Sequence, residues 1–219
     1  KLVEQPTTLE NMSKAVYSEE SKRWRFVQTL DWTRSFGKHD LGALVGYEAI
    51  RNWGFNTDMA KQGAADASLT DLSTYTELSN ITGTTWENTS RSFFGRLTYA
   101  YKSRYLFEVN ARYDGSSRFA PESRWGFFPS FSGGWRVSEE SFMQGSPFDN
   151  LKIRLSWGKL GNNSIGDYEW QATYSGSNYI FGDKLTSGLA QTVIANQKLR
   201  WESVTQTNIG LDFAILNNR

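Results

Sequence analysis

The stretch YLFEVNARYD, residues 105–114, places apolar and polar side chains at alternate positions. A period of two residues is that of a β-strand, because successive side chains of a strand point to opposite faces. One face would carry Tyr105, Phe107, Val109, Ala111 and Tyr113, and the other Leu106, Glu108, Asn110, Arg112 and Asp114. The first face is apolar and the second is mostly polar or charged, so we predict a strand with one apolar and one wet side.

The same alternation recurs along the chain, and together these segments predict about seven strands. The other six lie near residues 24–32, 41–49, 93–101, 125–137, 151–157 and 205–215. Pro129 has no N–H to donate to a strand partner, so we expect a bulge or looser pairing at that position.

The connections between these strands differ strongly in length. Short connections fall near residues 37–40 and 102–103, intermediate ones near 115–124 and 138–149, and long ones near 55–85 and 159–197. The long ones are rich in Gly, Ser, Thr and Asn, which is typical of solvated loops. Short turns at one end of the strands and long loops at the other are typical of antiparallel transmembrane β-barrels.

Composition excludes several classes of protein. A net charge of +1, with Lys and Arg spread along the chain, predicts no nucleic-acid partner. The absence of cysteine excludes disulfides and thiolate metal sites. No apolar run is long enough for a membrane-spanning helix. A chain with 15% aromatic residues and nine Trp that is polar on average fits a barrel with a wet lumen, and it also fits a glycan-binding sandwich.

Lys1 is not followed by a signal peptide, and seven strands do not make the even count of single-chain bacterial barrels. Two unpaired sheet edges are untenable in lipid. We therefore interpret residues 1–219 as part of one larger barrel domain.

Several motifs lie in and between the predicted strands. They are DGSSRFAP (114–121), RWGFFPS (124–130), GWRVSEE (134–140), LKIR (151–154), GKLGN (158–162), LRWE (199–202) and TQTNIGLDF (205–213). Together they closely resemble the SusC/RagA-type TonB-dependent outer-membrane transporters of Bacteroidetes. The resemblance covers about residues 93–219, and before that point the strand pattern alone supports it.

The resemblance implies a 22-stranded barrel in the bacterial outer membrane, with an N-terminal plug that is absent from this chain. It implies import of large nutrients, either glycans or peptides, with a SusD-like surface lipoprotein as partner. It also implies energy supplied by TonB, through a region that lies outside this chain.

No catalytic or metal site is expected, and no cofactor. His39 is the single histidine, and the Gly37–Asp40 sequence around it predicts a turn. The candidate substrate-binding residues are the polar side chains expected to face the lumen, namely Arg96, Glu108, Asn110, Arg112, Asp114 and Arg154. They could line a wet path for the solute or contact the plug, or they could pair with one another as a solvated wall.

Transport is thus the leading hypothesis, and two alternatives stay open. A soluble β-sandwich that binds carbohydrate would bury the Tyr105/Phe107/Val109 face against a second sheet. A passive porin would share the barrel but would need neither plug nor lipoprotein.

Overall fold

The computed structural model describes residues 9–64, 66 and 68–215, with the backbone alone for 9–11. It divides into two compact units, Lys1–Trp24 with Arg51–Asn88, and Arg25–Ile50 with Thr89–Arg219. No helix in the described ranges is both long enough and apolar enough to cross a membrane.

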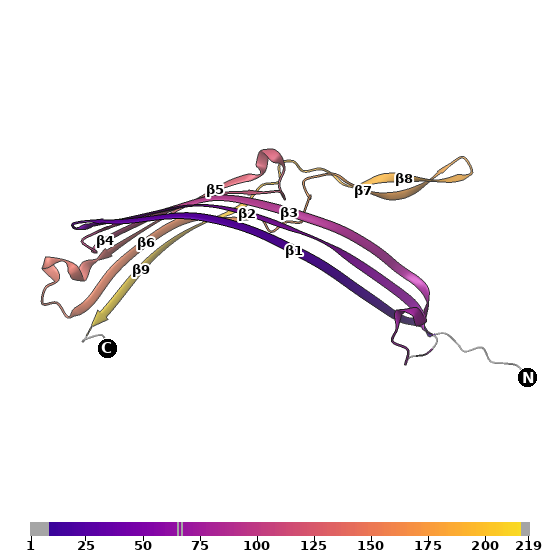
Figure 1. The fold of residues 1–219 in the computed structure, drawn as a ribbon, viewed down its shortest axis with the longest axis horizontal. Coiled ribbons are helices and arrows are strands. Elements are labelled where there is room, and N and C mark those ends of the chain that lie inside the picture. The colour runs from indigo at the N-terminus through magenta and orange to yellow at the C-terminus, as the bar shows by residue number, and fades with distance from the viewer. Residues whose placement is uncertain (1–8, 65, 67, 216–219) are drawn as a thin grey trace, which may run out of the picture. The chain divides into compact units, whose positions relative to one another are not determined.

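The main sheet has seven strands, which lie side by side in the order β1-β2-β3-β4-β5-β6-β9, and the second unit contains β4, β5, β6 and β9 with parts of β1, β2 and β3 (Figure 1). Their bounds are β1 Leu9–Phe36, β2 His39–Ala64, β3 Tyr75–Tyr101, β4 Tyr105–Ser116, β5 Trp125–Arg136, β6 Phe148–Asn162 and β9 Glu202–Ile215. The pairs from β3 to β9 are antiparallel. The prediction of seven antiparallel strands is confirmed.

The register gives the sheet two distinct faces, because cross-strand partners share a face. One row across β3, β4, β5, β6 and β9 reads Thr98, Glu108, Ser132, Ser156, Asn208. The row beside it reads Leu97, Val109, Phe131, Trp157, Thr207. We call the side of the first row the polar face and the side of the second row the apolar face.

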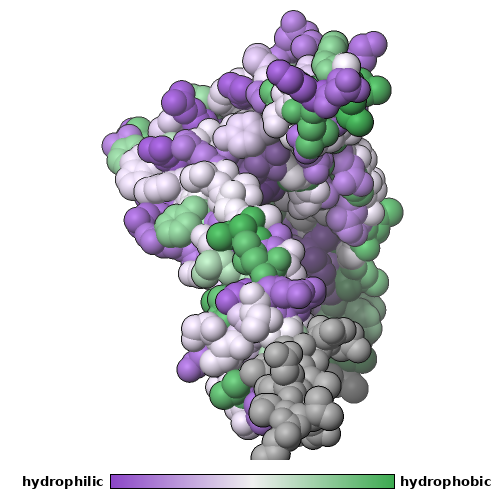
Figure 2. Space-filling model, turned by 90° about the vertical axis from the view of Figure 1, so that its right-hand side faces the viewer, coloured by the Kyte–Doolittle hydropathy of each residue, from purple (hydrophilic) through white to green (hydrophobic). Residues whose placement is uncertain are grey.

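The apolar face is open to its surroundings. Leu97 is 60% exposed, Phe107 54% and Ile209 81%, although each is a large hydrophobic side chain. Seen from another side, the molecule shows hydrophobic residues interspersed with polar ones at its surface (Figure 2). No second sheet in the described part of the chain covers this face, so the structure does not support the sandwich alternative.

The long connections differ from the expectation, because much of their length is strand. Within 55–85, β2 continues to Ala64 and β3 starts at Tyr75, after a short 3-10 helix at Leu72–Thr74. Within 159–197, the hairpin β7 (Thr173–Phe181) and β8 (Lys184–Val193) forms a separate two-stranded sheet. Both sides of β7, β8 and the first part of β3 are largely exposed, whereas both sides of β2 beyond Phe55 are mostly half-buried. In neither case does one face differ clearly from the other, so the alternation that marks a half-buried strand is missing from their sequence.

The bulge expected at Pro129 is absent from the β4–β5 ladder, where Pro129 pairs with Ala111 in continuous register. The β5–β6 ladder starts one residue later, at Ser130 and Gly158. Pro129 thus lies where its missing N–H interrupts no ladder bond to β6.

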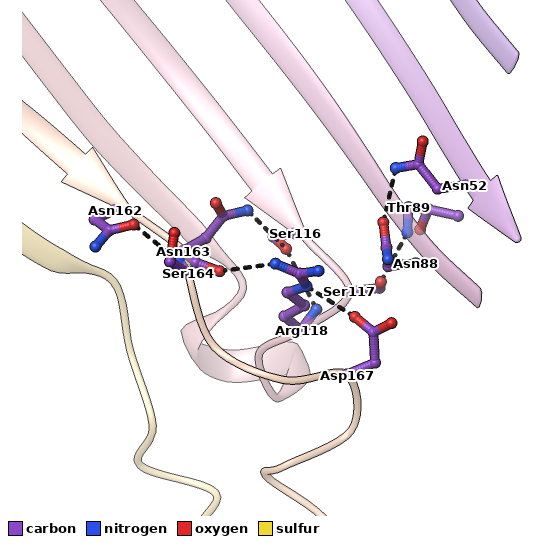
Figure 3. Close-up of polar contacts among 10 residues, drawn as sticks. All are labelled: Asn52, Asn88, Thr89, Ser116, Ser117, Arg118, Asn162, Asn163, Ser164 and Asp167. Carbon is purple, nitrogen blue, oxygen red and sulfur yellow. Dashed lines mark hydrogen bonds and ion pairs between the residues drawn. The ribbon is translucent and has the colours of Figure 1, made fainter. Parts of the chain in front are cut away.

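The first unit contains the remaining parts of β1, β2 and β3. Arg51 donates two hydrogen bonds of 2.9 Å to the carboxylate of Glu87. Asn52 Nδ2 donates to Asn88 Oδ1 at 2.8 Å (Figure 3). These side-chain pairs tie β2 to β3 in a region with few buried apolar residues, where direct polar contacts replace a core.

Candidate functional site

A hollow of about 800 Å³ lies over the second unit, and two of the six candidate residues, Glu108 and Arg154, line it. Its polar lining comes from seven strands and includes Thr33, Arg34, Ser35, Asp40, Thr98, Glu108, Ser132, Lys152, Arg154, Ser156 and Asn208. Hydroxyl, amide and charged groups of both signs therefore face one water-accessible space. Such a surface suits a hydrophilic solute or a polar protein surface.

Arg154 forms a bidentate ion pair in this group. Its Nε and Nη2 donate to the two carboxylate oxygens of Asp212 on β9, at 2.7 and 2.6 Å. Lys152 is the cross-strand partner of Asp212. Two cations therefore share one carboxylate, which leaves positive charge on this part of the polar face.

Arg112 is at the centre of a second group. It donates to Asp114 at 3.2 and 3.0 Å and lies 3.8 Å from the carboxylate of Glu48 on β2. Glu48 also accepts from Arg25 on β1 at 2.6 Å. The guanidinium of Arg112 stacks over Phe94 at 5.2 Å. Three strands thus contribute to one charge network.

The structure brings all six candidate residues to the polar face. Asn110 donates to Glu108 at 2.8 Å and is the cross-strand partner of Arg96. The contacts of Arg112, Asp114 and Arg154 are with neighbouring side chains of the wall. That geometry fits a self-paired wall, and their role in binding a solute stays a prediction.

The DGSSRFAP motif builds a buried aromatic cluster that the alternation of polar and apolar residues does not predict. Phe119 is completely buried, at 0% exposure, and its ring centroid lies 5.2 Å from that of Trp201. Phe128 contacts Trp201 at the same 5.2 Å, and Trp201 Nε1 donates to the carbonyl of Arg124 at 3.0 Å. A side chain at Gly161 would overlap the Phe128 ring. The aromatic residues within the motifs are the feature of the sequence from which this cluster could have been predicted.

Arg118 ties this motif to the connection after β6 (Figure 3). Its Nε donates to Asp167 Oδ1 at 2.8 Å and its Nη1 to the carbonyl of Asn163 at 3.3 Å. Asn163 Nδ2 in turn donates to Ser116 Oγ at 3.3 Å. The Ser116–Arg118 segment is therefore clamped by polar contacts beside the buried aromatic cluster.

The match to known proteins agrees with this geometry. Residues 5–219 match the family model described as TonB dependent receptor-like, beta-barrel. The chain belongs to the TonB-dependent receptor β-barrel family. The match extends beyond residues 93–219, where the motifs lie, and confirms the resemblance noted in the sequence.

Relatives of this TonB-dependent receptor chain include the TonB-dependent receptor SusC of Bacteroides thetaiotaomicron, 37% identical over 87% of this chain and 19% of SusC. TonB-dependent receptor P3 of Formosa agariphila is 34% identical over 87% of this chain and 19% of its own length. The solved structure of the RagAB peptide transporter matches with a TM-score of 0.80 and 31% identity, over 94% of this chain and 23% of that one. The chain thus spans about a fifth of these curated relatives, and the family is one of transporters.

Glu140 organises the opposite end of this barrel segment, between the 3-10 helices Val137–Glu139 and Ser141–Met143. Its carboxylate accepts from Tyr105 Oη at 2.5 Å, Arg104 Nη1 at 2.7 Å and Trp135 Nε1 at 3.0 Å. The hydrogen bonds from Tyr105 and then Trp135, with the charge of Arg104, hold the pKa of Glu140 below its usual value.

His39 lies differently from the expectation. The turn is confined to residues 37–38, and His39 is the first residue of β2. Its Nδ1 is hydrogen-bonded to Tyr99 Oη at 2.8 Å. In the described part of the chain, no three His, Cys, Asp or Glu side chains converge as metal ligands.

Proposed function

We propose that this chain is a wall segment of a single β-barrel domain, in an outer-membrane importer that takes up large nutrients with energy from TonB. The observation that supports it is an exposed apolar face bounded by two aromatic rows. Tyr101, Tyr105 and Trp135 form one row, with ring centroids 6.3 and 6.4 Å apart. Transmembrane barrels carry an apolar band between two such aromatic girdles.

The second row lies at the other end of the same strands. Trp125 stacks with Tyr113 at 4.8 Å and with Phe93 at 6.2 Å. The stretches 93–101, 105–113 and 125–135 between the rows match the roughly 9–11 residues that a tilted strand needs to cross the hydrocarbon. In water, exposure of this apolar face would carry a large free-energy cost, whereas lipid acyl chains solvate it.

The proposed substrate is a glycan or a peptide. The polar hollow supports a hydrophilic solute, since hydroxyl, amide and charged groups can replace its hydration. Among the relatives, the RagAB structure is titled a peptide transporter. Both signs of charge in the hollow suit a peptide, and its Ser, Thr and Asn side chains suit a glycan equally well.

The proposed partner on the cell surface is a SusD-like lipoprotein, and TonB would act through a part of the protein outside this chain. The β7–β8 hairpin supports a surface partner, because Ile180, Phe181, Leu185 and Leu189 are among its most exposed residues. Exposed apolar patches of this kind mark interaction sites. The proposal gives the chain no catalytic role.

Uptake by cells that express the full-length protein tests the proposal. Labelled oligosaccharides and labelled peptides would be offered to matched strains with and without TonB. We expect accumulation of one substrate class that depends on TonB, and recovery of the protein in the outer-membrane fraction. Uptake that persists without TonB would instead support the passive porin, and recovery in the soluble fraction would refute both.

A further inference from the structure

A dense aromatic row crosses the apolar face where the strands meet the short turns. The centroid of the His39 ring lies 4.8 Å from that of Tyr101. The row continues from Tyr101 to Tyr105 and then to Trp135. Phe36 precedes His39 across the two-residue turn that joins β1 to β2. We call these five residues the turn-end row. Aromatic rings at this level mark the depth of lipid headgroups.

Three cationic side chains accompany the turn-end row. The Arg34 guanidinium lies 4.7 Å from the centroid of the Phe36 ring, and Lys102 Nζ lies 5.3 Å from that of Tyr101. Lys38 is next to Lys102, because the Lys102 N–H donates to the Lys38 carbonyl at 2.6 Å. The turns of β1–β2 and β3–β4 are thus in direct contact.

Nearby carboxylates are too few to neutralise these cations. Glu140 forms a 2.7 Å ion pair with Arg104, and Asp40, which accepts a hydrogen bond from Ser35, is a single carboxylate beside three cations. Arg34, Lys38 and Lys102 form no ion pair with any residue in the described ranges. The turn-end row therefore has an excess of exposed positive charge.

The turn itself holds Lys102 in an unusual backbone conformation. Lys102 and Ser103 have φ values of 53° and 52°. A turn with both central residues left-handed prefers Asn-Gly, because a Cβ is disfavoured in that region. A lysine at this position is therefore not explained by turn formation, which points to a use for its ammonium group.

We propose that the turn-end row and its three cations dock the headgroup of an anionic phospholipid. The inference rests on the proposed membrane location. Short turns of such barrels face the periplasm. The turn-end row therefore contacts the periplasmic leaflet, which consists of phospholipids. The phosphate accepts hydrogen bonds from Lys38 and Lys102, Arg34 reaches the same level along Phe36, and the acyl chains lie against the apolar face.

The choice of phospholipid follows from charge and shape together. An anionic headgroup complements three unpaired cations, whereas a zwitterionic headgroup brings its own cation close to them. A free phosphate would use the lysines but would leave the aromatic row without a partner. The site therefore predicts selectivity for phosphatidylglycerol over phosphatidylcholine, and weak binding of inorganic phosphate.

Native mass spectrometry of the full-length protein from nanodiscs tests this. Nanodiscs would contain phosphatidylcholine with a minority of phosphatidylglycerol, and a parallel sample would receive inorganic phosphate. We expect retained phosphatidylglycerol in the wild type and a loss of about fivefold in affinity for each of Lys38→Gln and Lys102→Gln. The matched control is Lys184→Gln, an exposed lysine at the start of β8.

Equal retention of phosphatidylglycerol by the double lysine variant and the Lys184→Gln control would overturn the proposal. So would equal retention of phosphatidylcholine by the wild type, or displacement of the lipid by phosphate alone. Heat-modifiable migration in SDS gels, measured on the same variants, reports barrel insertion independently. Failure of the wild type to insert would count against the membrane location, whereas intact insertion of the wild type and of both lysine variants without lipid selectivity would count against the lipid site alone.

Discussion

Val109 decides, at the scale of a single residue, which face of the sheet meets lipid. It lies midway along β4 on the apolar face, paired with Leu97 and Phe131. Val109→Arg would place a charge near the bilayer midplane at a cost of roughly 2–4 kcal/mol. We expect the full-length variant to be strongly depleted from the outer membrane, as measured by heat-modifiable migration.

Ser132→Arg is the control at the same depth, because Ser132 pairs with Glu108 on the polar face. An arginine there meets water and a carboxylate, so assembly is expected to stay near that of the wild type. Equal depletion of both variants, or equal tolerance of both, would contradict the assigned faces.

Glu140 makes stability at the turn end depend on pH. Its native pKa is lowered by donors from Tyr105, Trp135 and Arg104, so the ionised form is favoured in the folded state. The contribution of ionised Glu140 to the free energy of unfolding is complete above the unfolded pKa of about 4.3. It is lost as the pH falls through the lower native pKa. We expect Glu140→Gln to lower the urea midpoint of the full-length barrel at pH 7, and the difference from wild type to shrink towards pH 3.

Glu139→Gln is the matched control, since the Glu139 side chain is exposed and is the immediate neighbour. It should leave the urea midpoint close to that of the wild type at both pH values. A Glu140→Gln effect that is constant from pH 7 to pH 3 would show that the carboxylate charge is not the cause.

At the scale of the element, the sequence predicts strands well where one face is apolar and the other is wet. The stretch 105–114 illustrates this, since its alternation fixes both the strand and the sides of its residues. The same test fails for β7 and β8, whose two faces are both exposed and whose sequence therefore lacks the alternation. The first part of β3 was missed for the same reason, and the end of β2 was missed because both of its faces are half-buried.

The polar face shows the same division between what can and cannot be predicted. That Arg112 and Arg154 share a face follows from their position in the alternation alone. That Arg112 approaches Glu48, and that Arg154 forms a bidentate pair with Asp212, depends on the pairing and register of strands distant in sequence. Periodicity along one strand contains no information on its neighbour's register.

Phe119 is the residue through which the DGSSRFAP element is held in place. Its side chain is fully buried against Trp201. Truncation of a buried Phe to Ala costs about 3–5 kcal/mol in a core that cannot relax. We expect Phe119→Ala to make the segments around 116–124 and 163–171 sensitive to protease in intact cells, at unchanged levels of the barrel.

Phe142→Ala is the control, because Phe142 is an exposed phenylalanine in a 3-10 helix at the turn end. It should leave protease sensitivity unaltered. Protection of Phe119→Ala equal to that of wild type would show that the polar clamp around Arg118 suffices to hold the loop.

The β7–β8 hairpin offers an element that can be changed without touching the barrel wall. Ile180→Ser with Phe181→Ser removes two exposed apolar side chains near its tip. If a lipoprotein covers them, each loss costs roughly 1.5–3 kcal/mol, so co-purification of the partner should fall at least tenfold. Thr186→Ser, on the opposing strand, is the control. Unchanged co-purification would place the partner's contact elsewhere.

At the scale of the whole molecule, the edges of the sheet decide whether the chain is stable in lipid. In the described residues β1 and β9 are the outermost strands of the seven, and each has a partner on one side. Unpaired backbone N–H and C=O groups cost several kcal/mol each in hydrocarbon, so an open edge cannot remain there. The single-domain proposal therefore requires other strands of the same barrel to pair with both edges.

Residues 1–219 produced alone should accordingly fail to insert as a monomer. We expect no heat-modifiable species when this chain is refolded into detergent or lipid, and aggregation through its two edges. The full-length protein, refolded in parallel, should give that species. Supplying the remaining barrel strands as a second chain should restore some insertion, because backbone pairing across β1 and β9 does not require a covalent link. A stable inserted monomer of residues 1–219 would mean that these strands satisfy their own edges, and the proposal of one larger barrel domain would have to be abandoned.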